Sequence, residues 1–117
     1  MAQMKWVTLH VADMQRSLDF YGKLLGMSVA QHIAAHGNEI NMMDPGSGAW
    51  VELLHREGET VDDPGQGISF GLQFDDVEAV VAKVRDAGVE VAGPISPNPH
   101  LKFYFIDDPD GYTIQLL

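Results

Sequence analysis

The feature of this 117-residue sequence that most restricts its fold is an internal repeat with an offset of 63 positions. The residues that correspond under this shift are Trp6 and Ser69, Leu9 and Leu72, His10 and Gln73, Asp13 and Asp76, and Glu52 and Gln115. Self-similarity at a fixed period is the signature of a repeated structural unit. The sequence therefore predicts two modules of one plan, residues 1–57 and 67–117, joined by a polar linker over residues 58–66.

Both modules are expected to follow the order strand, helix and three further strands. The first module is predicted to contain a strand at 5–11, a helix at 14–25 and strands at 27–33, 39–43 and 49–54. The second is predicted to contain a strand at 68–74, a helix at 77–87, a strand at 89–92, a proline-bearing loop at 93–99, and strands at 101–106 and 112–117. The predicted class is α+β, a single domain over residues 1–117 built from two βαβββ modules.

Alternation along the strands separates a helix-facing side from a second side of mixed character. The apolar stripes expected on the helices are Leu18, Tyr21, Leu24 and Leu25 in the first and Val80, Val81 and Val84 in the second. The side chains that strand parity assigns to the opposite face are Trp6, Thr8, His10, Trp50, Glu52, Leu54, Ser69, Gly71, Gln73, Thr113 and Gln115. Two indoles beside hydroxyls, amides, an imidazole and a carboxylate favour a ligand pocket over a solvated sheet face.

Composition limits the classes of partner. The sequence has 17 acidic and 7 basic residues, a formal charge of -10, which repels nucleic acid and anionic membranes and favours a cationic ligand. It contains no cysteine, and no apolar run reaches the ~20 residues of a membrane span. We therefore expect a cytoplasmic protein with a small-molecule ligand.

Three stretches carry a resemblance to a known family: HVADMQRSLDFYGKLLGM from His10, WVELL from Trp50, and FIDDPDGYTIQLL from Phe105. They resemble the vicinal oxygen chelate superfamily, which includes glyoxalase I, bleomycin-resistance proteins and extradiol dioxygenases. The resemblance implies a glyoxalase/bleomycin-resistance-type fold, with a concave mixed sheet and the helices on its outer face. It also implies a homodimer with paired or swapped modules.

The resemblance places the metal-ligand positions of the family enzymes at Trp6, Glu52, Ser69 and Gln115. Of these, only Glu52 offers a strong ligand, and a divalent ion needs about three. Gln115 stands where glyoxalase-type isomerisation expects a glutamate that shuttles a proton, and an amide cannot take up a proton near neutral pH. We therefore predict no cofactor and no metal, unless His10, Glu52 and His100 form a rearranged site.

The sequence leaves three functional hypotheses. The first is a metal-free binding protein similar to the bleomycin-resistance proteins, with a planar or cationic ligand held by Trp6, Trp50 and the other side chains of the mixed face. The second is a metal-dependent lyase or isomerase of the lactoylglutathione lyase (glyoxalase I) type, or a related dioxygenase, in which His10 and Arg56 would contact glutathione. The third is a metal-free enzyme with Glu52 as the catalytic base.

Overall fold

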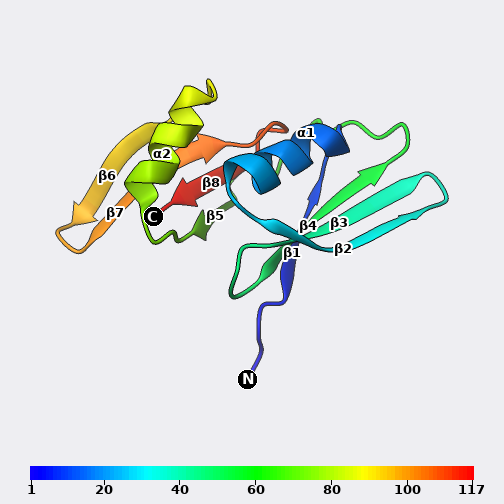
Figure 1. Ribbon diagram of the computed structural model, residues 1–117, viewed down its shortest axis with the longest axis horizontal. Helices are drawn as coiled ribbons and strands as arrows, with labels where there is room; N and C mark the ends of the chain where they lie inside the picture. The colour runs from blue at the N-terminus through cyan, green and yellow to red at the C-terminus, as the bar shows by residue number, and fades with distance from the viewer. The chain divides into compact units, whose positions relative to one another are not determined.

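The computed structural model describes residues 1–117, and the chain divides into two compact units, Met1–Asp62 and Asp63–Leu117. The boundary between the units falls inside the segment expected to be a linker. Each unit contains one four-stranded mixed sheet and helical structure, as Figure 1 shows. No helix of the chain has the length and apolar character that crossing a membrane requires.

The first unit has the predicted order of elements. Its strands are β1 (Trp6–His10), β2 (Ser28–Ala35), β3 (Asn38–Asp44) and β4 (Trp50–Arg56). In the sheet they lie in the order β1-β4-β3-β2, with β1 parallel to β4 and the other pairs antiparallel. This arrangement leaves β1 and β2 at the two edges of the sheet.

The expected single helix at 14–25 is instead a short α-helix, α1 (Met14–Leu18), continued by a π-helical segment, η1 (Asp19–Leu24). The Asp13 carboxylate accepts a hydrogen bond from the Arg16 N–H at 3.1 Å and caps the N-terminus, as expected for an aspartate just before a helix. The wider π turn moves the buried stripe, so the Phe20 side chain is buried whereas Leu18 and Leu24 are only half-buried. The predicted stripe is therefore buried at Tyr21 and Leu25 and half-buried at Leu18 and Leu24.

The second unit repeats this plan. Its strands are β5 (Ser69–Leu72), β6 (Ala92–Asn98), β7 (Leu101–Asp107) and β8 (Thr113–Leu116), in the order β5-β8-β7-β6. Its helix is α2 (Val77–Asp86), which begins at an Asp76 cap and ends with Gly88 in the left-handed region at φ 85°. Figure 1 shows α2 lying over β7 and β8.

The prediction for residues 89–99 was wrong, because the segment expected to be a loop forms β6. Proline removes a ladder N–H, and so it is tolerated mainly on edge strands. β6 is an edge strand, and its paired residues, Ala92, Ile95 and Asn98, avoid both Pro94 and Pro97. The two prolines thus sit between the points at which β6 pairs with β7.

A polar cluster joins α2 to β7. The Glu78 carboxylate accepts hydrogen bonds from the Lys102 ammonium at 2.5 Å and from the Tyr104 hydroxyl at 2.7 Å. The bond from Lys102, followed by that from Tyr104, lowers the pKa of Glu78, and the same carboxylate raises the pKa of Lys102 and of Tyr104. The Glu78 and Lys102 side chains are about half exposed, and together with Tyr104 they connect the helix to the sheet.

Burial confirms the two faces that strand parity predicted. The odd-numbered Val51 and Leu53 of β4 are 3% and 0% exposed, whereas the neighbouring Trp50, Glu52 and Leu54 are half-buried. In β8 the Ile114 and Leu116 side chains are fully buried, and Thr113 and Gln115 are half-buried. Each unit therefore buries one sheet face under its helical segment and leaves the mixed face accessible.

The strand registers confirm the repeat at the level of residue pairs. Trp6 lies beside Trp50 and Thr8 beside Glu52 in the first sheet, and 63 positions later Ser69 lies beside Thr113 and Gly71 beside Gln115. The π turn accounts for a departure from this offset in the helical segment, because 13 positions separate Asp13 from Gly26 but only 12 separate Asp76 from Gly88. The helical segment of the first unit therefore holds one more residue than its counterpart.

Candidate functional site

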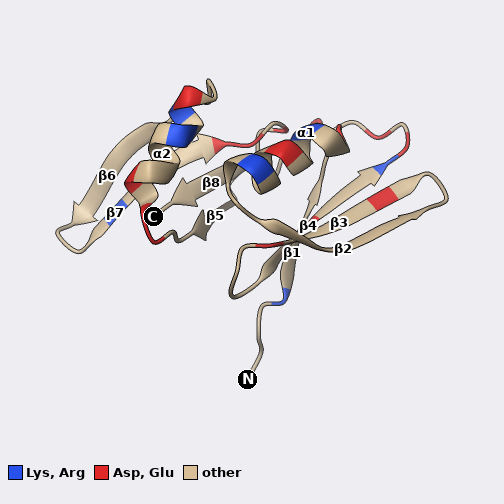
Figure 2. Ribbon diagram, in the orientation of Figure 1, with Lys and Arg blue, Asp and Glu red and all other residues tan.

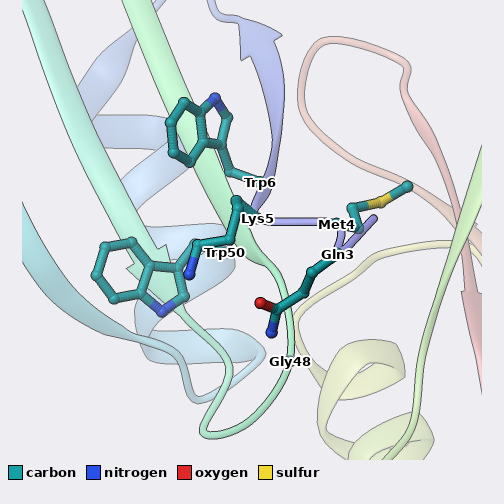
Figure 3. Close-up of a pocket in the computed structure, with 6 residues that line it drawn as sticks. All are labelled: Gln3, Met4, Lys5, Trp6, Gly48 and Trp50. Atoms are coloured by element: carbon teal, nitrogen blue, oxygen red, sulfur yellow. The ribbon is translucent and has the colours of Figure 1, made fainter. Parts of the chain in front are cut away.

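The mixed face of the first sheet begins with a pair of indoles. Trp6 of β1 and Trp50 of β4 lie directly beside each other in the parallel ladder, and the Trp6 side chain is 52% exposed. Figure 3 shows both rings on the same side of the sheet. They line a pocket of about 160 Å³ whose other lining residues are Gln3, Met4, Lys5 and Gly48. An exposed aromatic wall of this kind suits a flat ring.

The next pair along the same strands is Thr8 and Glu52. The Thr8 hydroxyl donates a hydrogen bond to Glu52 Oε1 at 2.7 Å. The second carboxylate oxygen accepts no hydrogen bond from the chain. Glu52 follows Trp50 by two residues on the same face of β4, a separation of roughly 7 Å along the strand, so this carboxylate belongs to the row of side chains next to the indole pair. It is an acceptor with a negative charge next to an aromatic wall.

The third pair, His10 and Leu54, extends the face to the end of the strands. His10 Nδ1 and Glu59 Oε1 are 2.5 Å apart, so a residue of the loop after β4 joins the face. This loop is acidic, with Glu57, Glu59, Asp62 and Asp63, as Figure 2 shows. Sequence parity missed Glu59 because it lies outside any strand, although the acidic composition of the loop is plain in the sequence.

The mixed face of the second sheet carries no charged residue and no histidine on its paired strands β5 and β8. The Gln115 side-chain amide donates a long hydrogen bond of 3.5 Å to the Ser69 hydroxyl. Thr113 is turned toward β7, where its hydroxyl donates to Asp107 Oδ1 at 3.1 Å. Gln73 lies exposed just beyond the end of β5.

Two aromatic residues on this face were missing from the predicted set. Phe105 of β7 pairs with Gln115, and its ring meets that of Phe103 edge to face at 5.3 Å between centroids. Their alternation within the strand at 101–107 is a sufficient signal, but the predicted face drew only on the first and last strands of each module. With these rings, the mixed faces of both sheets include an aromatic wall.

The structure also places the remaining predicted residues. Arg56 is exposed at the end of β4, beyond the residues of β4 that pair with β1. Its neighbour in register is Asn38 of β3. His100 lies in the turn between β6 and β7, where its backbone N–H donates to the Asn98 side chain at 2.8 Å. His10 bonds Glu59 rather than Glu52. The three residues of the conceivable rearranged metal site are therefore not assembled within either unit.

The four positions at which family enzymes hold a metal do not fit a divalent ion in this chain. Trp6 has no ligating atom, and the Ser69 hydroxyl is a weak neutral donor that already receives the Gln115 amide. Glu52 supplies the only carboxylate, and one of its oxygens is occupied by Thr8. Nor does either unit gather three or more His, Asp or Glu side chains in a group able to hold a metal. A hard or borderline cation lacks the ligand set that it requires here.

Comparison with known proteins agrees with this fold. The profile of the Glyoxalase/Bleomycin resistance protein/Dioxygenase superfamily matches residues 3–116. The chain belongs to this superfamily.

Relatives of this chain within the superfamily are named both as enzymes and as a binding protein. A probable lactoylglutathione lyase from Synechocystis sp. is 32% identical over 117 residues, which cover 93% of this chain and 89% of that protein. Among solved structures, the trypanothione-dependent glyoxalase I of Leishmania major superposes with a TM-score of 0.82 at 26% identity, covering 100% of this chain and 86% of the other. The antibiotic binding protein TnmS3 from Streptomyces sp. CB03234 gives a TM-score of 0.76 at 26% identity, with 99% and 94% covered. The superfamily is thus established, and its members include both enzymes and binding proteins.

Proposed function

We propose that this protein binds a planar, cationic small molecule against the mixed face of its sheets, without a divalent metal. The observation that carries the proposal is the arrangement of Trp6, Trp50 and Glu52 on adjacent strands. Indole faces attract flat and cationic groups, with each contact contributing about 0.5–2 kcal/mol. The open oxygen of Glu52 supplies the complementary charge beside them.

Charge supports the same ligand class. The formal charge of -10 and the acidic loop after β4 raise the local concentration of cations near this face. Lys5 is the one cation in the lining of the indole pocket. Its ammonium group opposes a positive charge held close to Trp50, so the charged part of the ligand belongs nearer to Glu52.

The relatives support the proposal in part. TnmS3 is described as an antibiotic binding protein, which shows that this fold serves binding in a protein 26% identical to this chain. We also propose that the ligand-binding form is a homodimer with paired or swapped modules. Size-exclusion chromatography with a mass of one 12.8 kDa chain at micromolar concentration would contradict the dimer.

Tryptophan fluorescence tests the binding directly. The chain has two tryptophans, and both lie on the mixed face of the first sheet, so their emission reports this surface alone. Titration with proflavine, a planar cation, is expected to quench the emission to saturation. Acridine at pH 8, a planar ring of similar size without the charge, is the matched control and is expected to bind about tenfold more weakly. Failure of every planar cation to quench would refute the proposal.

The second candidate is a metal-dependent lactoylglutathione lyase, favoured by the names of relatives at 32–33% identity. It requires a metal that the residues at positions 6, 52, 69 and 115 do not fit. Protein purified without chelator and assayed for formation of lactoylglutathione with added Ni²⁺ or Zn²⁺ separates the two candidates. One equivalent of bound metal, lost in Glu52→Ala together with lyase activity, would establish the enzyme.

A further inference from the structure

On the mixed face of the second sheet, one position has no side chain, Gly71 of β5. The strand registers make Gly71 the repeat partner of Thr8, and place it beside Gln115 as Thr8 is placed beside Glu52. Thr8 fills its position and donates to Glu52. Gly71 does neither. Its backbone is not in the left-handed region that favours glycine, so the absence of a side chain matters for space rather than for chain geometry.

A side chain at Gly71 would lie next to the Gln115 amide, between it and the side chain of Leu117. A Cβ added at Gly71 would come within 3.9 Å of Gln115 Oε1 and 3.3 Å of Leu117 Cδ2. The amide oxygen accepts no hydrogen bond from the chain, and the amide nitrogen makes only its 3.5 Å contact with Ser69. Gln115 therefore presents a donor and an acceptor, side by side, to a neighbouring molecule.

A primary amide in this state is complementary to one kind of ligand edge. An N–H adjacent to a C=O, as in a lactam or cyclic imide, can donate to Oε1 and accept from Nε2 at once. A glutamate at position 115 would accept only and would not match such an edge. The Phe105 ring, which lies across from Gln115 in β7, provides an apolar surface for the body of the same ligand.

We propose that Gln115 recognises the lactam or imide edge of a planar ligand, and that Gly71 determines this specificity by leaving the amide accessible. The proposal rests on the proposed binding function of the mixed face, and it names the chemical group that the mixed face of the second sheet recognises. Position 115 is one of those at which the family enzymes hold a metal. In this chain, the proposal gives the neutral amide of Gln115 a role in ligand recognition instead.

The test uses a matched pair of probes, 1,8-naphthalimide and N-methyl-1,8-naphthalimide. Both are planar, and only the first has an imide N–H. The side-chain amide signal of Gln115 in a ¹⁵N–¹H correlation spectrum, assigned by its loss in Gln115→Leu, reports the contact. We expect 1,8-naphthalimide to shift this signal and to bind about fivefold or more tightly than the methylated compound, since one added hydrogen bond is of this order.

Variants separate recognition from folding. Gly71→Thr is expected to block the site and remove the preference for the N–H compound, and Gln115→Leu to remove the preference without adding bulk. Gly22→Ala, where a Cβ would meet other atoms only at 3.7 Å, controls for loss of a glycine and is expected to retain the preference. Well-dispersed spectra establish that each variant is folded.

The outcomes are distinct from those of the tryptophan titration. Equal binding of the two imides, binding of neither, an unshifted Gln115 signal, or a preserved preference in Gln115→Leu would each overturn the proposal. Quenching of Trp6 and Trp50 by proflavine would survive any of these results, because those residues lie in the first sheet. Loss of proflavine binding would instead refute the proposed function itself.

Discussion

Replacement of Glu52 by glutamine tests the electrostatic part of the proposed function. The substitution keeps the size of the side chain and leaves an oxygen to accept the Thr8 hydroxyl, but it removes the charge. A cation 4 Å from a carboxylate gains about 1 kcal/mol in bulk water and about 4 kcal/mol at an effective dielectric constant of ~20. Because Glu52 is half-buried, we expect a loss near the lower part of this range, about 1.4 kcal/mol, or roughly tenfold in affinity.

Glu57→Gln is the matched control. It removes the same charge from the exposed loop after β4, beyond the strand that carries Glu52. Titration of tryptophan emission with proflavine at low and moderate salt is the assay, and Glu57→Gln is expected to change the affinity less than twofold at moderate salt. An affinity of Glu52→Gln within twofold of the parent, or an equal loss in both variants, would show that the carboxylate does not contact the ligand.

Four further predictions concern the fold and the site. Leu53→Ala, at a position that is 0% exposed, is expected to lower the free energy of unfolding by about 2–5 kcal/mol. Leu54→Ala, on the mixed face, is expected to lower it by clearly less. Equal losses of the free energy of unfolding in urea denaturation would contradict the assignment of the two faces. Lys5→Gln is expected to strengthen proflavine binding modestly, since it removes a positive charge from the pocket lining, and weaker binding would place the ligand's charge elsewhere. Glu78→Gln is expected to be less thermostable than the parent near neutral pH: a carboxylate whose folded pKa is lowered contributes stability above its ordinary value of 4.5, and this contribution disappears as the pH falls through the folded pKa. The melting temperatures of the two proteins should therefore converge in acid, and a constant difference would contradict the role of the Glu78 charge. Trp50→Leu is expected to weaken proflavine binding about three- to tenfold while the chain remains folded, since the side chain is half-buried; an unchanged affinity by calorimetry would exclude stacking on this indole.

The fold was largely predictable because its determinants are local and repeated. The alternation in WVTLH and WVELL predicts which side chains share a face, and the 63-residue offset predicts that the two modules repeat one order of elements. The predicted cap Asp13 and its repeat partner Asp76 stand at the two helix starts, and the side chain of each accepts a backbone hydrogen bond. Each of these signals depends on residues close together in the sequence or on a strict period.

What the sequence did not predict depends on tertiary context. Pro94 and Pro97 argued for a loop, and only the edge position of β6 makes a strand possible there. The extra residue of the first helical segment could lengthen a loop or widen the helix into a π turn. The structure has the π turn, and the Phe20 side chain within it is buried. No local pattern distinguishes these alternatives.

The candidate site also combines features that the local sequence predicts with features that depend on the folded chain. Strand parity alone predicts that Trp6, Trp50 and Glu52 share one face, and the register of β1 with β4 confirms that they are neighbours. Glu59 reaches the same face from a loop whose path the sequence does not specify. The space next to Gln115 is equally a property of the folded sheet, because it depends on where Leu117 and Gln115 lie relative to Gly71.

The central claim is that the protein binds a planar cation without a metal, and one titration tests both parts. Proflavine is added to untreated protein and to protein stripped and kept in excess EDTA, with tryptophan emission as the signal. We predict saturable quenching with the same dissociation constant in both samples. Absence of quenching in the untreated protein, or quenching that EDTA abolishes and Ni²⁺ or Zn²⁺ restores, would contradict the claim.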